Sequence, residues 1–235
     1  KGVDLKVHKG EIVGLYGLVG AGRSELAKAI LGKFEVTSGE VIVNGSVAKI
    51  NSVADAVGRY GIGYVSEDRK AEGLILLHSV LENVGIPIWR RLSQLGGFLT
   101  NGKVRKHTEP YIRKLEVRTP SLEQRVGNLS GGNQQKISVA KWLAAEAQVL
   151  IIDEPSVGID IKTKTYLHEL IRELSDAGTA ILLITSDMPE MIALADRIVV
   201  MNDYAVMGGL ANTRDYTEMS EGIMGLIQGA EPTAA

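Results

Sequence analysis

The sequence predicts an α/β fold in which helices cover a mostly parallel sheet. Short runs of branched apolar residues alternate with segments whose apolar residues recur at helical spacing. A glycine-rich loop, residues 17–24, separates the first buried run from the first helical segment. A later apolar run, residues 149–152, ends in two carboxylates, Asp153 and Glu154. Near-continuous apolar runs of this kind are typical of parallel strands that are buried on both faces.

The N-terminal part is predicted to contain two strands and a helix. Val3, Leu5 and Val7 alternate as in a strand, and residues 11–16 form an apolar run of strand length. Residues 25–31 have apolar side chains at helical spacing. The chain starts at Lys1 rather than at a methionine and reaches a strand pattern at once, so we expect a fragment of a longer protein.

The next segments predict a small antiparallel element and another core strand. Residues 41–43 are strand-like and lead into Asn44-Gly45, a typical hairpin turn. Residues 61–65 form a short apolar run that ends in a charged patch, residues 67–70. Either a functional segment or a solvated loop is consistent with this patch.

The character of the chain then changes over residues 80–115, which hold fewer strand formers and include a break at Gly96-Gly97 and a helix-like stretch from Lys103. We therefore expect an inserted helical lobe. After it, residues 137–145 have the apolar spacing of a helix.

Ser130, Gly131 and Gly132 directly precede this helix, where backbone amides and the helix dipole attract an anion. The C-terminal part continues the alternation, with strands expected over residues 180–185 and 197–201 and helices over residues 162–177, 188–195 and 220–228. Residues from Gly229 onward are expected to form a tail.

Composition disfavours nucleic-acid binding and excludes sites that need cysteine. The 235 residues include 26 basic and 28 acidic side chains, which leaves no overall positive field for nucleic acid. There is no cysteine, so disulfides and thiolate metal sites are impossible, and the four histidines lack metal-ligand spacing. No apolar run reaches the roughly 18 residues of a membrane helix.

The loop at residues 17–24 is close to the phosphate-binding pattern G-x-x-x-x-G-K-S/T, in which glycines turn backbone amides toward a phosphate. Ser24 supplies the hydroxyl that binds Mg²⁺, but Arg23 replaces the lysine. Arginine keeps the charge, yet it is planar and bulkier, so the two are not equivalent. The alternative is a tight turn that needs glycine for backbone geometry alone.

Asp153 follows a hydrophobic strand, where a carboxylate can hold Mg²⁺ opposite Ser24. Glu154 is then placed to orient or activate a water that attacks the γ-phosphate. Two adjacent acids after a strand also occur as a helix cap or a surface pair.

Residues 129–136, LSGGNQQK, resemble the signature motif of ATP-binding cassette (ABC) ATPases, with Asn133 at a usual glutamine position. Together with residues 64–70 and 17–26, this form resembles the second cassette of bacterial monosaccharide importers, in which two cassettes are fused. The similarity runs from about Val7 to Met201. It implies a P-loop NTPase of the ABC ATPase type, with a RecA-like core (residues 1–70 and 136–235) and a helical signature part (about 71–135).

The resemblance assigns roles residue by residue and implies ATP and Mg²⁺ as cofactors. Glu154 takes the position of the catalytic carboxylate, Ser24 and Asp153 hold the metal, with Glu67 as a further possible ligand, and Ser130, Gly131 and Gly132 act in trans on a partner cassette. Residues 157–160 match the D-loop. The nucleotide-binding positions are Gly17, Leu18, Val19, Gly20, Ala21, Gly22, Arg23, Ser24, Glu25, Glu67 and Ser186.

Three departures fall on one nucleotide site. Arg23 replaces the phosphate lysine, Glu67 stands where a γ-phosphate-sensing glutamine is usual, and Ser186 replaces the switch histidine. Serine cannot take up charge as imidazole does. We therefore expect a degenerate Walker site in this cassette, while its LSGG motif completes the active site of its partner.

The family further implies a head-to-tail second cassette, a transmembrane permease, which would dock around residues 74–89, and indirectly a sugar-binding protein. The expected location is peripheral, on the cytoplasmic face of the bacterial inner membrane, and no nucleic-acid partner is expected. Alternatives are a fully active ATPase subunit, a module in which ATP only clamps the dimer, and a DNA-repair or translation ABC protein. The adenine-stacking aromatic residue of the family would lie at or before Lys1.

Overall fold

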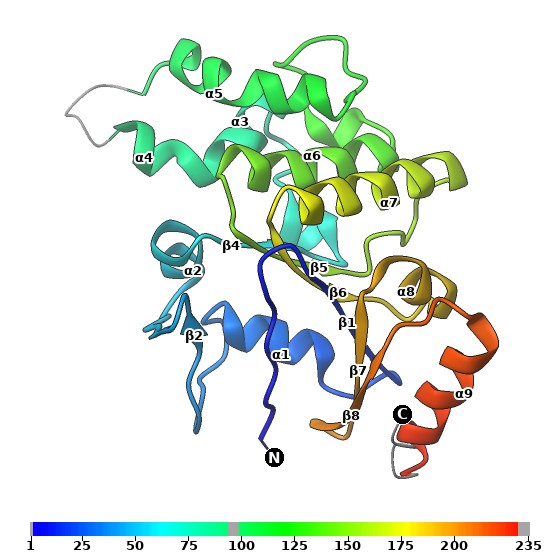
Figure 1. The fold of residues 1–235 in the computed structure, drawn as a ribbon. Helices are drawn as coiled ribbons and strands as arrows, with labels where there is room; N and C mark the ends of the chain where they lie inside the picture. Colours follow the sequence, from blue (N-terminus) through cyan, green and yellow to red (C-terminus); the bar gives the residue numbers. More distant parts are fainter. Residues whose placement is uncertain (1, 94–98, 230–235) are drawn as a thin grey trace.

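The computed structural model describes residues 2–93 and 99–229, which contain a six-stranded sheet (Figure 1). The strand order is β4-β5-β6-β1-β7-β8. The parallel strands are β1 (Ile12–Gly17), β4 (Ile62–Val65), β5 (Val149–Asp153), β6 (Ala180–Ile184) and β7 (Arg197–Asn202). β8 (Ala205–Ala211) pairs antiparallel with β7 and was not predicted, because its glycines and half-exposed side chains interrupt any apolar run. The expected mostly parallel α/β fold is confirmed.

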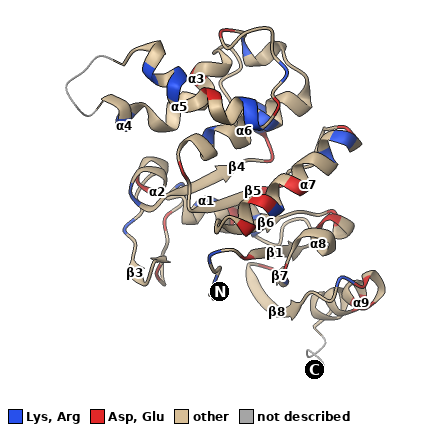
Figure 2. Ribbon diagram, turned by 45° about the horizontal axis from the view of Figure 1, so that its top comes forward, with Lys and Arg blue, Asp and Glu red and all other residues tan. Residues whose placement is uncertain are grey.

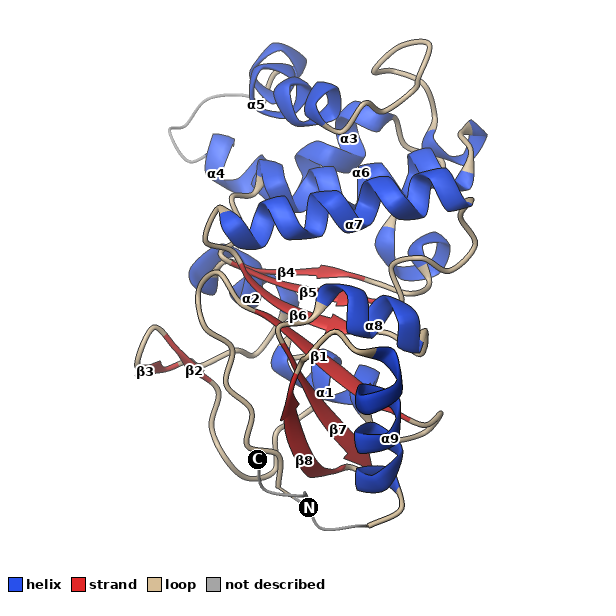
Figure 3. Ribbon diagram, turned by 45° about the vertical axis from the view of Figure 1, so that its right-hand side comes forward, coloured by secondary structure: helices blue, strands red, loops and turns tan. Residues whose placement is uncertain are grey.

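Helices cover both faces of the sheet (Figure 3). One face carries α1 (Arg23–Ile30) and α2 (Val53–Tyr60), and the other carries α6 (Gly131–Ala144), α7 (Ile161–Asp176), α8 (Met188–Leu194) and α9 (Tyr216–Ile227). Alternation along β1 divides the core, since Val13 and Leu15 pack on the α1 side and Ile12 packs on the opposite side.

The predicted helical lobe is present beside the β4 edge of the sheet (Figure 1). It consists of η1 (Arg69–Gly73), α3 (Val80–Gly85), η2 (Ile86–Ile88), α4 (Trp89–Ser93), α5 (Asn101–Lys114) and η3 (Val126–Asn128), packed with α6. The break predicted at Gly96-Gly97 and the tail at residues 230–235 lie outside the described residues.

The expected strand at Val3, Leu5 and Val7 is wrong. Residues 2–7 pair with no strand in the described part of the chain. The three side chains are instead partly buried against the apolar cluster on the α1 side of the sheet. Alternation therefore reflects one buried face here, and a strand also requires a partner for its backbone groups.

Other boundaries also differ from the sequence expectation. The small antiparallel element is confirmed as β2 (Ile42–Val43) and β3 (Ser46–Val47). The last helix begins at Tyr216, four residues before the predicted start, because the Asp215 side chain accepts a hydrogen bond from the amide of Glu218. α2 was missed, although Ser52 caps it in the same manner.

Charged residues of both signs are spread over many elements of the fold. Figure 2 shows Lys and Arg on several elements, including α5, α6 and α7, interspersed with Asp and Glu.

Within residues 2–93 and 99–229, none of the helices has the length and apolar character to cross a bilayer.

Candidate functional site

The glycine-rich loop joins the end of β1 to the start of α1, at the carboxyl edge of the sheet. Gly20 and Gly22 have φ of 84° and 93°, a left-handed conformation that favours glycine. At Gly17 an added Cβ would lie 2.4 Å from the carbonyl oxygen of Met201, so β1 and β7 leave no space for a side chain. Val19 at the loop tip is 97% exposed. The tip of the loop, residues 18–20, is thus exposed directly before the start of α1.

Arg23, the first residue of α1, does not extend freely from this loop. Its Nη1 donates a hydrogen bond to the backbone carbonyl of Thr185, which follows β6, at 3.1 Å. Burial raises the pKa of both Asp153 and Glu154, and the positive charge of Arg23 opposes that rise. The guanidinium therefore lies among the acids at the strand tips.

Asp153 is the centre of the acidic group, with a side chain that is buried. The hydroxyl of Tyr64 donates to its Oδ2 at 2.9 Å, whereas its buried Oδ1 has no partner. Burial raises the pKa of Asp153, and the nearby hydroxyls of Tyr64 and Ser24 oppose that rise. An unpartnered carboxylate oxygen beside a serine hydroxyl suits a hard divalent cation, so these residues fit Mg²⁺.

Glu154 follows β5 in a left-handed conformation, with φ of 46°. The amide of Ser186 donates to its Oε1 at 2.8 Å, and the hydroxyl of Thr185 lies 3.4 Å from its Oε2. Burial raises the pKa of Glu154, while the hydrogen bonds from Ser186 and the charge of Arg23 lower it. A non-glycine residue at positive φ costs about 1 kcal/mol or more, and such strain is typical of functional sites.

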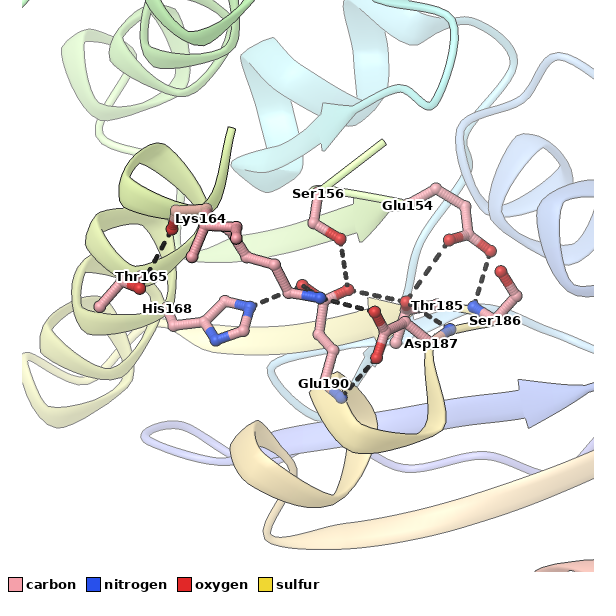
Figure 4. A network of polar contacts seen from close by, with 10 residues as sticks. Glu154, Ser156, Lys164, Thr165, His168, Thr185, Ser186, Asp187 and Glu190 are labelled. Carbon is pink, nitrogen blue, oxygen red and sulfur yellow. Dashed lines mark hydrogen bonds and ion pairs between the residues drawn. The ribbon is translucent and has the colours of Figure 1, made fainter. Parts of the chain in front are cut away.

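Behind Thr185 lies a buried carboxylate, Glu190 of α8 (Figure 4). Its Oε2 accepts hydrogen bonds from Thr185 Oγ1 at 2.7 Å and Ser156 Oγ at 3.2 Å. Its Oε1 lies 2.6 Å from Nε2 of His168 on α7. The segment that holds Glu154 is therefore fixed from behind by α7 and α8.

Ser130, Gly131 and Gly132 form the start of α6, as predicted. The Ser130 side chain accepts hydrogen bonds from the amide and the side-chain nitrogen of Asn133, at 3.4 and 2.9 Å. Ser130 itself is exposed. An added Cβ at Gly131 would lie 2.9 Å from the carbonyl oxygen of Gly158, so this helix start lies against the segment that resembles a D-loop.

The predicted site residues thus lie in two separate places in the structure. Arg23, Ser24, Asp153, Glu154 and Ser186 come together at the carboxyl edge of the sheet. Ser130, Gly131 and Gly132 belong to a second group beside residues 157–158. The exposed side chains of Glu25 and Glu67 form no hydrogen bond or ion pair with either group in the described part of the chain.

Two tyrosines of the site were not predicted. Tyr64 orients Asp153, and its position one residue from the end of a buried strand was the available signal. Tyr204, in the turn between β7 and β8, has φ of 60° and donates its amide to the carbonyl of Ala21. Its ring lies against Gly22, where an added Cβ would be 2.5 Å from Cδ1. No local pattern announces this contact, because it joins segments far apart in the sequence.

The amino-acid sequence of this chain is similar to those of known proteins. The family model described as ABC transporter matches residues 1–157. The chain is 45% identical to the ribose import ATP-binding protein RbsA of Clostridium perfringens, over 95% of this chain and 45% of that protein. It is 44% identical to the xylose import ATP-binding protein XylG of Thermoanaerobacter pseudethanolicus, over 88% and 41%. The chain thus spans less than half the length of these relatives.

Solved structures agree in fold. The ATP-binding cassette MJ0796, in a dimeric post-hydrolysis state bound to ADP and Pi, superposes with a TM-score of 0.76 at 25% identity, over 90% of this chain and 89% of that one. A nucleotide-free ATP-binding cassette from an ABC transporter gives a TM-score of 0.77 at 18% identity, over 94% and 88%. At this lower identity the likeness concerns the fold alone. The expected ABC ATPase fold is confirmed.

Proposed function

The chain belongs to the ABC transporter family, and from this premise we propose that it is the ATP-binding cassette of a sugar importer, coupling ATP binding and hydrolysis to movement of a permease. Nucleotide binding is supported mainly by one observation. The loop at residues 17–24, which includes Ser24, lies next to Asp153 and Glu154 at one edge of the sheet. Relatives named for ribose and xylose import support the sugar assignment.

In this proposal the loop amides and the N-terminus of α1 hold the phosphates of ATP. Asp153 and Ser24 hold Mg²⁺, which when bound neutralises charge that develops on the phosphates. Tyr64 keeps the Asp153 carboxylate oriented, which leaves Oδ1 available. Glu154, held by the Ser186 amide, accepts a hydrogen bond from the attacking water.

We further propose that the nucleotide site of this cassette is degenerate, while its signature motif completes the site of a second cassette. Arg23 donates to the Thr185 carbonyl in place of a free lysine, and Ser186 binds Glu154 through its amide but lacks the imidazole of a switch histidine. Exposed Glu67 adds a negative charge where a neutral glutamine is usual. By contrast, exposed Ser130 at the start of α6 keeps the family pattern. These differences support an asymmetric pair.

The remaining assignments follow from the family. We propose a second cassette fused head to tail, a permease that contacts the region of residues 74–89, and an associated sugar-binding protein. The cassette would lie peripherally on the cytoplasmic face of the bacterial inner membrane, with no nucleic-acid partner. Its division into a RecA-like core, residues 1–70 and 136–235, and a helical part over about 71–135 is part of the same proposal. Exposed Ile75 and Leu77, at 46% and 76%, support the permease contact.

The test of the proposed function is Mg²⁺-dependent binding of ATP. We expect titration calorimetry to detect binding by the wild-type protein and a loss of the Mg²⁺-dependent part in Asp153→Asn. The variant keeps the shape of the side chain but lacks the charge that holds the cation. Asp176→Asn at the end of α7 is a matched control that should bind as the wild type does. Absence of ATP binding by the wild-type protein would contradict the proposal.

Tyr64→Phe should weaken the Mg²⁺ site without removing a ligand. The variant loses the 2.9 Å hydrogen bond to Asp153 Oδ2, so the carboxylate is less well oriented. Removal of such a supporting contact costs about 10- to 100-fold in metal affinity. The Mg²⁺ concentration for half-maximal ATP binding should rise accordingly. Tyr60→Phe, which loses a hydroxyl that accepts from the amide of Lys49, should leave it unchanged.

A further inference from the structure

The short helix η1 (Arg69–Gly73) begins in the charged patch at residues 67–70. From the sequence, this patch could be either a functional segment or a solvated loop. The five residues of η1 form a π-helical turn, a rare conformation that is frequent at functional sites. Asp68 caps it by accepting hydrogen bonds from the amides of Lys70 and Ala71 at 3.1 and 3.0 Å. The first helical residue, Arg69, is only 9% exposed. The patch is therefore not a solvated loop throughout.

Arg69 joins this turn to the D-loop segment. Its Nη1 donates to the carbonyl oxygen of Val157 at 2.9 Å, and its Nη2 donates to that of Gly158 at 3.2 Å. The planar guanidinium is the side chain whose donors can bind two successive carbonyls at once. An added Cβ at Gly131 would lie 2.9 Å from Nη2. The guanidinium thus lies between the D-loop and the first residue of the signature helix.

The rest of η1 is tied to two other elements. The Glu72 carboxylate pairs with Lys28 of α1 and with Lys33 just beyond that helix, each at 3.2 Å. The carbonyl of Gly73 accepts a hydrogen bond from Nζ of Lys141 in α6 at 2.5 Å. The turn is held on both sides, so Arg69 has a fixed base from which to position the D-loop.

Stability alone does not explain a buried arginine here. In the described residues no carboxylate lies within ion-pair distance of Arg69, and its Nε has no hydrogen-bond partner. Burying a cation without a counter-charge is unfavourable, and apolar replacement of buried charges is often neutral or stabilising. Val157 and Gly158 are exposed, so water can satisfy their carbonyls if the arginine is removed.

We propose that Arg69 is a positioning residue that holds the D-loop against the start of α6. The D-loop and the signature residues then present one fixed surface to the second cassette. The proposal rests on the proposed function, because the pairing of cassettes gives this surface its role. Arg69 lies two residues after Glu67, so the same turn links that segment to the surface.

The test is Arg69→Met in the longer protein with its permease, compared with Arg69→Lys and with Arg91→Met. Arg91 also donates to a backbone carbonyl, that of Ala144 at 3.2 Å, but lies in the helical lobe. For Arg69→Met we expect kcat for ATP to fall about tenfold or more, because small displacements of positioned groups are costly. KM and the melting temperature should stay near wild type, and amide hydrogen exchange at residues 156–160 should accelerate. Arg69→Lys should recover part of kcat, and Arg91→Met should retain it.

The exchange, turnover and stability measurements together test the positioning role of Arg69. Unchanged exchange at residues 156–160 in Arg69→Met overturns the proposal, whatever the ATPase result. A fall in kcat matched by a large fall in melting temperature in both Arg69 variants also overturns it, because that indicates a structural role alone. Absence of ATP binding and hydrolysis by the wild-type protein overturns the proposed function instead, and the exchange measurement still decides the role of Arg69.

Discussion

Ser130→Arg should abolish ATP turnover in the two-cassette protein that we propose, while Glu154→Gln should leave much of it. Ser130 is exposed at the N-terminus of α6, where its hydroxyl and the following amides can reach a nucleotide on the partner. The larger arginine would fill that space. Loss of preorganised donors at a phosphate typically costs about 100-fold or more in turnover.

Glu154→Gln removes only the negative charge of a carboxylate that the Ser186 amide and Arg23 already engage. If this cassette's own site turns over slowly, its loss matters little to the total rate. The measurement is steady-state phosphate release by the purified transporter. Equal losses from the two variants would rule out the asymmetry and favour a fully active subunit.

Ser52→Arg is the matched control for Ser130→Arg. Ser52 also caps a helix, accepting a hydrogen bond from the amide of Asp55 at 3.2 Å, but it caps α2. Loss of a serine cap costs about 1 kcal/mol of stability in either place. Turnover near wild type in Ser52→Arg would show that the effect at Ser130 arises from its place in the site.

The sequence was sufficient for the parts of the fold that local patterns determine. The apolar run of β5 predicted a buried strand with Asp153 at its tip, and Ser130 predicted the start of α6. Both features depend on residues that are close in the sequence, so hydrophobic periodicity and helix-capping preferences are enough to predict them. The same locality misled at Val3, whose alternating neighbours have one buried face but no strand partner.

Contacts between segments that are far apart in the sequence could not be predicted from local patterns. Arg69 is one of four consecutive charged residues, and only the fold places it beneath Val157 and Gly158. Tyr204 reaches Gly22 because β7 lies next to β1 in the sheet. The hydrogen bond between Arg23 and Thr185 likewise spans the gap between α1 and β6. These residues decide how the site is held, and their partners follow from topology rather than from spacing.

Glu190→Ala should destabilise the fold more than any other single change proposed for this protein. The variant removes the shorter of the two hydrogen bonds that the buried hydroxyl of Thr185 donates, and it removes the partner of His168 and Ser156. Loss of one member of a buried polar network costs about 3–5 kcal/mol in the free energy of unfolding. For a chain of this size the melting temperature should fall by about 10 °C.

Glu190→Gln separates the loss of charge from the loss of the network. Glutamine keeps an oxygen that can accept from Thr185 and Ser156, and its amide group can face His168. We expect less than half of the stability loss of Glu190→Ala, measured by urea unfolding. Glu169→Ala, at an exposed position of α7, should be near neutral. Equal stability of Glu190→Ala and Glu169→Ala would contradict a supporting role for the network behind Glu154, because Thr185 would then keep its position without the carboxylate.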